Sequence, residues 1–120
     1  HKSDDRDDIL QKFMKSTEPL VLVSPSMTEG VDLKDDLARW EIIVKIPYPY
    51  LGDKQVSRRM EVDPDWYVWQ TCLKLVQSYG RIFRSETDWG SAYIFDSGAQ
   101  YFIHKYKHIL PKWFLEAIHK

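Results

Sequence analysis

The stretch Trp-Glu-Ile-Ile-Val-Lys-Ile, residues 40–46, is apolar along most of its length and has the composition of a β-strand. Two shorter apolar runs flank it, residues 20–23 before it and residues 92–95 after it. Short, nearly continuous apolar runs are typical of strands that are covered on both faces, as in parallel sheets. The three runs therefore predict the strands of a parallel sheet.

A strong helix signal lies between the second and third runs. Asp63 is placed to cap the helix, Pro64 occupies its first position and Asp65 adds negative charge there. Residues at helical spacing follow, and we expect one stripe along the helix: Trp69, Leu73, Val76 and Gly80. Strands and helices alternate, so the fold class is α/β, with a mostly parallel sheet flanked by helices.

Helices are also predicted at both ends of the chain. Ser3 is expected to cap a first helix, which acidic residues begin and an apolar stripe continues: Asp4, Asp5, Asp7 and Asp8, then Ile9, Leu10, Phe13 and Met14. Near the other end, a turn at residues 97–98 leads into a helical stretch, and Pro111 starts a separate short helix.

The composition indicates one globular domain, residues 1–120. With 43% hydrophobic and 29% charged residues, the chain is not disordered throughout. No apolar run approaches the roughly 20 residues of a membrane helix, so no membrane contact is expected. Three strands are few for a covered parallel sheet, and we expect the domain to be incomplete, with further strands upstream of residue 1.

The single cysteine, Cys72, excludes a disulfide within the chain and any Cys-based zinc or iron–sulfur cage built from this chain alone. It favours a reducing, intracellular compartment, the cytoplasm. His104 and His108 have the i, i+4 spacing of a metal-binding pair but no evident third ligand, and the N-terminal aspartates are better explained by the start of a helix. No metal site is predicted.

The charge pattern is nearly neutral. The net charge is −1, and residues 1–40 hold six Lys and Arg against nine Asp and Glu, whereas residues 81–120 hold six against four. This gradient is too weak for a basic field that attracts nucleic acid. Phosphate chemistry would therefore depend on individually placed arginines.

Two segments carry ligand-binding residue types, and both are expected at the carboxyl ends of strands, where open α/β sheets bind ligands. In the first, residues 24–33, Gly30 lets the backbone approach a ligand, and oxygen atoms surround it on Thr28, Glu29 and Asp32. The alternative for this segment is an ordinary structural loop.

The second segment, residues 77–84, is Gln-Ser-Tyr-Gly-Arg-Ile-Phe-Arg. If the helix continues through it, Gln77, Arg81 and Arg84 lie on one face, which Gly80 leaves uncrowded. Two guanidinium groups suit a γ-phosphate better than lysines would, because arginine binds phosphate in a bidentate fashion. The alternative is a solvated arginine face, or one paired with nearby acids, Glu86 and Asp88.

Together the segments resemble a known family. Residues 26–33, Ser-Met-Thr-Glu-Gly-Val-Asp-Leu, are similar to motif V of the XPD/DinG branch of superfamily 2 helicases. Residues 77–85 are similar to its motif VI, Gln-x-x-Gly-Arg-x-x-Arg. Ile-Pro-Tyr-Pro at 46–49, and Asp-x-Gly at 88–90 with the following strand, also fit the branch. The order and spacing cover roughly residues 18–118.

The resemblance implies the second RecA-like (P-loop NTPase-like) motor domain of an ATP-dependent DNA helicase of the kind used in DNA repair. On the family pattern, Arg81 and Arg84 reach the γ-phosphate, one of them as arginine finger, and Gln77 helps to order the contact. The other implied site residues are Glu29, Gly30, Asp32 and Gly80 for the nucleotide site and its coupling, and Ser26 and Thr28 for the strand backbone.

The resemblance also implies a partner, the N-terminal RecA-like domain of the same protein. That domain would hold most of the ATP and magnesium, because this chain contains no Gly-x-x-x-x-Gly-Lys-Ser/Thr sequence. In many relatives it also carries an iron–sulfur cluster, on which this sequence is silent.

The sequence departs from the family between residues 50 and 62, where a short loop is expected in place of a longer helical segment. Arg58 and Arg59, with the aromatic residues Tyr48, Tyr50 and Trp66, could form a stacking and phosphate surface for a single strand, or could be ordinary amphipathic surface whose tyrosines cover the sheet edge. Two functions remain open: a motor half that is inactive alone, and a non-catalytic module that binds single strands or a protein. An unpaired apolar strand edge also predicts self-association and weak affinity for single-stranded DNA.

Overall fold

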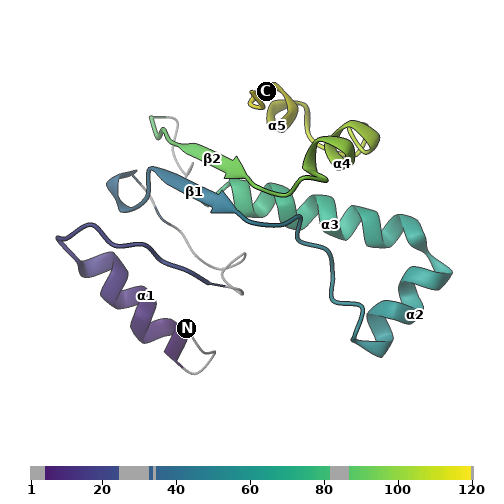
Figure 1. Cartoon of the computed structure of the whole chain (residues 1–120), viewed down its shortest axis with the longest axis horizontal. Helices are drawn as coiled ribbons and strands as arrows, with labels where there is room; N and C mark the ends of the chain where they lie inside the picture. The colour runs from purple at the N-terminus through teal and green to yellow at the C-terminus, as the bar shows by residue number, and fades with distance from the viewer. Residues whose placement is uncertain (1–4, 25–32, 34, 82–86, 120) are drawn as a thin grey trace. The chain divides into compact units, whose positions relative to one another are not determined.

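The computed structural model describes residues 5–24, 33, 35–81 and 87–119, and Figure 1 shows their elements. By internal contacts the chain divides into two compact units, His1–Val31 and Asp32–Lys120. Each unit is described by itself. The second unit holds both strands and the hydrophobic core.

The first unit contains helix α1, Arg6–Lys15. Its first turn carries Asp7 and Asp8 and its last turn Lys12 and Lys15, charges that suit the two ends of the helix dipole. The N-terminal helix is therefore confirmed, with Asp5 as N-cap; the expected cap, Ser3, lies outside the described residues.

The apolar run at residues 20–23 does not form a strand, so this part of the prediction is wrong. Leu20, Val21 and Val23 are exposed. An apolar run alone does not fix strand geometry.

The second unit begins with the short 3-10 helix η2, Asp35–Leu37, and contains two parallel strands, β1 (Trp40–Ile43) and β2 (Ser91–Ile94). Their register runs from Trp40↔Ser91 to Ile43↔Ile94. The predicted parallel pairing of these strands is confirmed, although both strands are shorter or shifted relative to the expected ranges.

The two faces of this sheet differ. Ile43 and Ile94 pack against the core, whereas Trp40, Ile42 and Tyr93 on the opposite face are exposed. The expectation that both faces are covered is not met among the described residues. Such an open apolar face is consistent with a domain whose sheet is larger than this one, and the predicted self-association stays a prediction.

Helix α2, Lys54–Val62, replaces the loop that the sequence reading placed between residues 50 and 62, so that expectation is wrong. The carboxylate of Asp53 accepts hydrogen bonds from the backbone N–H groups of Gln55 (2.8 Å) and Val56 (3.3 Å). This N-cap satisfies two otherwise unpaired donors and starts the helix. The sequence feature that could have predicted this helix is Asp53, a residue type that favours the N-cap position.

Helix α3, Pro64–Tyr79, follows directly, and Asp63 ends α2 and caps α3. The Asp63 carboxylate accepts from the backbone N–H of Trp66 at 3.2 Å, and Pro64 stands at the start of the helix, as predicted. The expected stripe is only partly buried: Val76 packs against the core, whereas Trp69 and Leu73 are exposed. The buried residues of α3 are instead Thr71, Cys72, Leu75 and Ser78.

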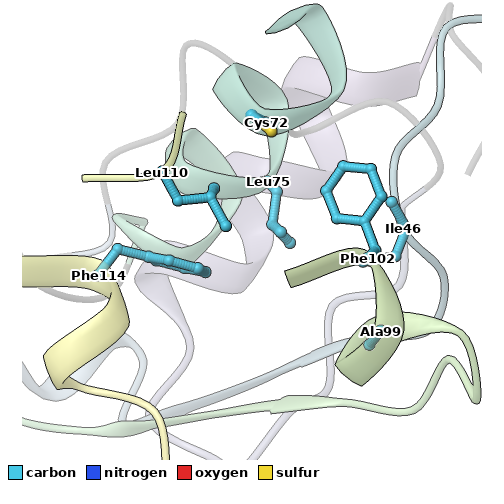
Figure 2. Close-up of a cluster of buried hydrophobic side chains, with 7 residues drawn as sticks. All are labelled: Ile46, Cys72, Leu75, Ala99, Phe102, Leu110 and Phe114. Atoms are coloured by element: carbon cyan, nitrogen blue, oxygen red, sulfur yellow. The ribbon is translucent and has the colours of Figure 1, made fainter. Parts of the chain in front are cut away.

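The core joins α3 to the two C-terminal helices, α4 (Ala99–Lys105) and α5 (Lys112–Glu116). Pro111 precedes α5, as predicted. Figure 2 shows the side chains of this core around Leu75, which is fully buried. Its members are Ile46, Cys72, Leu75, Ala99, Phe102, Leu110 and Phe114. The α4 and α5 residues therefore select which face of α3 is buried.

Candidate nucleotide-phosphate site

The predicted site residues divide by whether the structure describes them. Gln77, Gly80 and Arg81 are described at the end of α3, and Arg58 and Arg59 on α2. The others lie outside the described residues: Ser26, Thr28, Glu29, Gly30, Asp32 and Arg84. Their roles remain predictions.

The end of α3 determines how Gln77 and Arg81 are presented. The helix ends at Tyr79, and the backbone N–H of Gly80 donates to the carbonyl of Val76 at 3.0 Å. The next N–H, that of Arg81, donates to the carbonyl of Ser78 at 3.1 Å, which is the tighter spacing of a turn. The expectation that Arg81 continues the helical face of Gln77 is wrong, because the helix has already ended.

The expected location of this segment also needs correction. Its described residues, 77–81, form the last turn of α3 and the turn after it, so they do not lie at the carboxyl end of a strand. In Figure 1, α3 runs against the direction of both arrows. The Arg81 carbonyl accepts from the backbone N–H of Leu33 at 3.3 Å, which connects this turn to the chain before β1.

The local backbone does not require glycine at position 80. Its φ of −72° is open to any residue, and a Cβ there would lie 3.5 Å from the Val76 carbonyl oxygen, an ordinary contact. The described surroundings therefore give no steric reason for glycine at this position. Close approach of a ligand to the backbone would give one.

This observation allows a test with Gly80→Ala. We expect the free energy of unfolding of the chain to stay constant or rise by up to about 1 kcal/mol, because alanine restricts the unfolded chain. Chemical denaturation of the variant and the unmodified chain measures this difference. A destabilised chain would instead assign Gly80 a purely structural role.

Glu41, which the sequence reading missed, is a buried carboxyl group near this turn. It lies on β1 with its Oε1 shielded from solvent, and no described residue hydrogen-bonds that atom. Burial raises the pKa of Glu41 to about 8, and the positive charge of Arg81 partly opposes the increase. The sequence feature that could have identified Glu41 is its position as the single acidic residue among the apolar residues of that strand.

Gln77 adds a second buried acceptor close to the same helix end. Its Oε1 is shielded from solvent and accepts no hydrogen bond from the described residues. A buried amide oxygen without a donor is costly, and a donor from a ligand or from another part of the protein would remove that cost. The helix end thus combines Arg81 with two acceptor groups, Gln77 and Glu41.

Arg39, also missed from the sequence, joins the starts of the two strands. Its guanidinium donates to the fully buried carboxylate of Asp88 at 2.7 Å and to the Trp89 carbonyl at 3.0 Å. The same group stacks on the Trp89 ring at 4.4 Å from its centre. Asp88, considered as a partner for the motif arginines, is therefore held by Arg39.

The side chains of both arginines of α2 have partners on α2 or α3. Arg58 donates to the exposed carboxylate of Glu61 at 3.1 Å, and the Arg59 guanidinium lies over the Trp66 ring, 4.3 Å from its centre. An exposed ion pair of this kind contributes little to stability. The structure brings Arg59 and Trp66 together, as a stacking surface would require, but Arg58 already has an acidic partner.

Within residues 5–24, 33, 35–81 and 87–119, no three His, Cys, Asp or Glu side chains gather as a metal site would require. Among these residues, no helix has the length and apolar character that crossing a membrane demands.

Comparison with known proteins gives the family. The helicase C-terminal domain family matches residues 1–117. The Fanconi anemia group J protein homolog of Gallus gallus is 29% identical over 104 residues, covering 77% of this chain and 8% of that protein. The ATP-dependent DNA helicase YoaA of Haemophilus influenzae is 30% identical over 97 residues, covering 74% and 15%.

A third relative, the ATP-dependent DNA helicase CHL1 of Saccharomyces cerevisiae, is 25% identical over 142 residues, covering 98% of this chain and 16% of that protein. The chain therefore spans only 8% to 16% of the length of these three relatives. No solved structure matches the chain.

Proposed function

Since this chain belongs to the helicase C-terminal domain family, in the XPD/DinG branch of superfamily 2, we propose that it is the second RecA-like motor domain of an ATP-dependent DNA helicase. The observation that carries the proposal is the family match over residues 1–117, within which the motif-like segments stand in order. Two relatives are named ATP-dependent DNA helicases, which supports the activity proposed for the full-length protein.

In this proposal the motif VI segment acts on the terminal phosphate of ATP. Arg81 and Arg84 contact the γ-phosphate, and Gln77 orders that contact from the last turn of α3. Positive charge at the transferring phosphoryl group stabilises the charge that develops in the transition state. The Gln77 amide oxygen is buried and has no donor among the described residues, which supports the proposal that Gln77 receives its hydrogen bond only in the assembled ATP site.

The motif V segment links nucleotide and nucleic acid. We assign coupling to Glu29, Gly30 and Asp32, and backbone contacts with a single DNA strand to Ser26 and Thr28. Gly80 allows the nucleotide to approach the backbone, and Arg58 and Arg59 are candidate contacts for the strand. The motif V and Gly80 assignments derive from the motif similarity, whereas those of Arg58 and Arg59 derive from their residue type beside aromatic side chains. All are tested by substitution in the full-length protein.

An N-terminal RecA-like domain of the same protein supplies the rest of the ATP site in this proposal. ATP and magnesium require a P-loop and acidic magnesium ligands, and this sequence contains no P-loop. The arginines and amide of this chain fit the terminal phosphate, not the metal. Whether the full-length protein carries an iron–sulfur cluster is independent of every residue discussed.

The chain alone is expected to hydrolyse no ATP above background, because only one side of the site is present. Phosphate release by the purified 120-residue chain, with and without single-stranded DNA, checks this. Adding the N-terminal domain of the same protein should restore DNA-stimulated hydrolysis. Turnover by the chain alone that is lost in Arg84→Ala would contradict the proposal. DNA binding without hydrolysis by the full-length protein would favour the non-catalytic module.

A further inference from the structure

We propose that Tyr48, Tyr101, Lys105 and Tyr106, here called the Tyr–Lys surface, bind single-stranded nucleic acid by stacking bases on the rings and neutralising phosphates. The inference rests on the proposed function, in which the domain holds a single strand. It adds a specific surface outside motifs V and VI and separate from the arginines of α2.

The position of the surface follows from the parallel sheet. Tyr48 lies in the segment that follows β1, and α4, which carries Tyr101 and Lys105, follows β2. Because the strands are parallel, both segments leave the same edge of the sheet. This carboxyl edge is where open α/β sheets bind ligands. The end of α3, with Gln77 and Arg81, precedes β2 instead.

A carboxylate joins the two segments. Asp96 accepts hydrogen bonds from the backbone N–H groups of Ile46 at 3.0 Å and Gly98 at 2.9 Å. These bonds lower the pKa of Asp96, so its charge is present at neutral pH and is engaged by backbone donors. Tyr48 and α4 are therefore held together by the fold and need little rearrangement to present their rings.

The rings form a connected series along this edge. Tyr48 packs edge-on against Phe102, with ring centres 5.6 Å apart, and Phe102 contacts Tyr106 at 4.9 Å. Tyr48 and Tyr101 are 51% and 69% exposed, so both offer ring surface to a ligand. An exposed aromatic ring on a fixed backbone is a stacking platform for a base of any identity.

The cation lies among these rings. The Lys105 ammonium is 5.6 Å from the centre of the Tyr101 ring and 5.4 Å from that of Tyr106. No described carboxylate pairs with Lys105 or with the exposed Lys107 beside it. Such a lysine can neutralise a phosphate while the neighbouring ring stacks on a base.

The charge of the surrounding sequence distinguishes this surface from α2. Residues 97–115 contain three lysines and no Asp or Glu. Residues 53–65, which include α2, contain three Lys and Arg and four Asp and Glu, and Arg58 is already paired with Glu61. An anionic strand is therefore favoured at the Tyr–Lys surface. Exposed rings beside the lysines favour nucleic acid over a merely acidic protein.

The test measures binding of a fluorescent oligothymidine of about 20 nucleotides, longer than one site, to the 120-residue chain by anisotropy. We expect Tyr101→Ala to weaken binding roughly 5- to 150-fold, as loss of one stacked base does, and Tyr101→Phe to restore it. Lys105→Gln should reduce the slope of log affinity against log salt by about 0.7. Tyr93→Ala on β2, which is also half-exposed, and Lys112→Gln on α5, where the lysine is paired with Glu116, are matched controls and should change little.

Circular dichroism of each variant should show that these substitutions of exposed side chains leave the chain folded. The inference is overturned if the chain does not bind the probe at low salt, or if Tyr101→Ala and Lys105→Gln bind as the unmodified chain does. It is also overturned if Tyr101→Phe weakens binding as much as Tyr101→Ala, or if polyglutamate competes as well as oligothymidine. None of these readouts uses ATP. The proposed motor function is tested separately, by measuring ATP hydrolysis by the full-length protein.

Discussion

Replacing Arg84 by lysine in the full-length protein is expected to lower the rate of ATP hydrolysis at least about 10²-fold, since a whole arginine finger is worth roughly 10³–10⁵. Lysine keeps the positive charge but loses the planar pair of donors that binds two phosphate oxygens at once. That geometry matters most as negative charge develops on the transferring group, so ATP binding should remain nearly unchanged.

The measurement separates these two effects. Steady-state hydrolysis gives kcat, and titration with a fluorescent, non-hydrolysable ATP analogue gives Kd. Lys112→Arg is the matched control, because Lys112 is exposed and paired with Glu116 on α5. It should leave both values unchanged. Equal losses of affinity and turnover in Arg84→Lys would show that this arginine binds the ground state only.

Replacing Glu41 by glutamine is expected to make the chain more stable at pH 8 by an amount of the order of a few kcal/mol. The carboxylate form of Glu41 is penalised by burial, and its pKa is raised from the ordinary 4.5 to about 8. Glutamine has nearly the same shape and stays neutral. The positive charge of Arg81 offsets part of the penalty, so the gain is smaller than burial alone would give.

The direction of the pH dependence follows from proton uptake. Between pH 4.5 and about 8 the folded chain holds the Glu41 proton more tightly than the unfolded chain does. The free energy of unfolding therefore falls as pH rises through this window. Urea denaturation at several pH values should show this decline in the unmodified chain and a weaker one in Glu41→Gln. Glu61→Gln, an exposed control, should keep it; equal slopes for the chain and Glu41→Gln would contradict the assignment.

Local sequence signals specify much of this protein. Asp63 and Pro64 define the start of α3 because a cap and a fixed φ act through neighbouring backbone groups alone. The apolar runs at β1 and β2 correctly predict two parallel strands, although one face of the pair is exposed among the described residues. The family assignment also follows from residue identity and order along residues 1–117.

Contacts between distant segments account for what the sequence reading missed. The stripe expected on α3 depends on which side α4 and α5 occupy, and Phe102 and Phe114 bury the side of Cys72 and Leu75 instead. Helix periodicity specifies a spacing, whereas packing selects the face. The apolar run at 20–23 likewise needs a neighbouring strand, since strand geometry depends on hydrogen bonds to another segment.

The candidate phosphate site also depends partly on local sequence and partly on contacts between distant segments. Gln77 and Arg81 were found as a motif, but their relation is set by the end of α3 at Tyr79, where the turn removes Arg81 from the helical face. Glu41 has no local signal beyond its charge, because its raised pKa arises from burial beneath residues far away in the sequence. Residue types thus indicate which chemistry is available. Burial and distance, which come only from tertiary packing, establish which groups share a site.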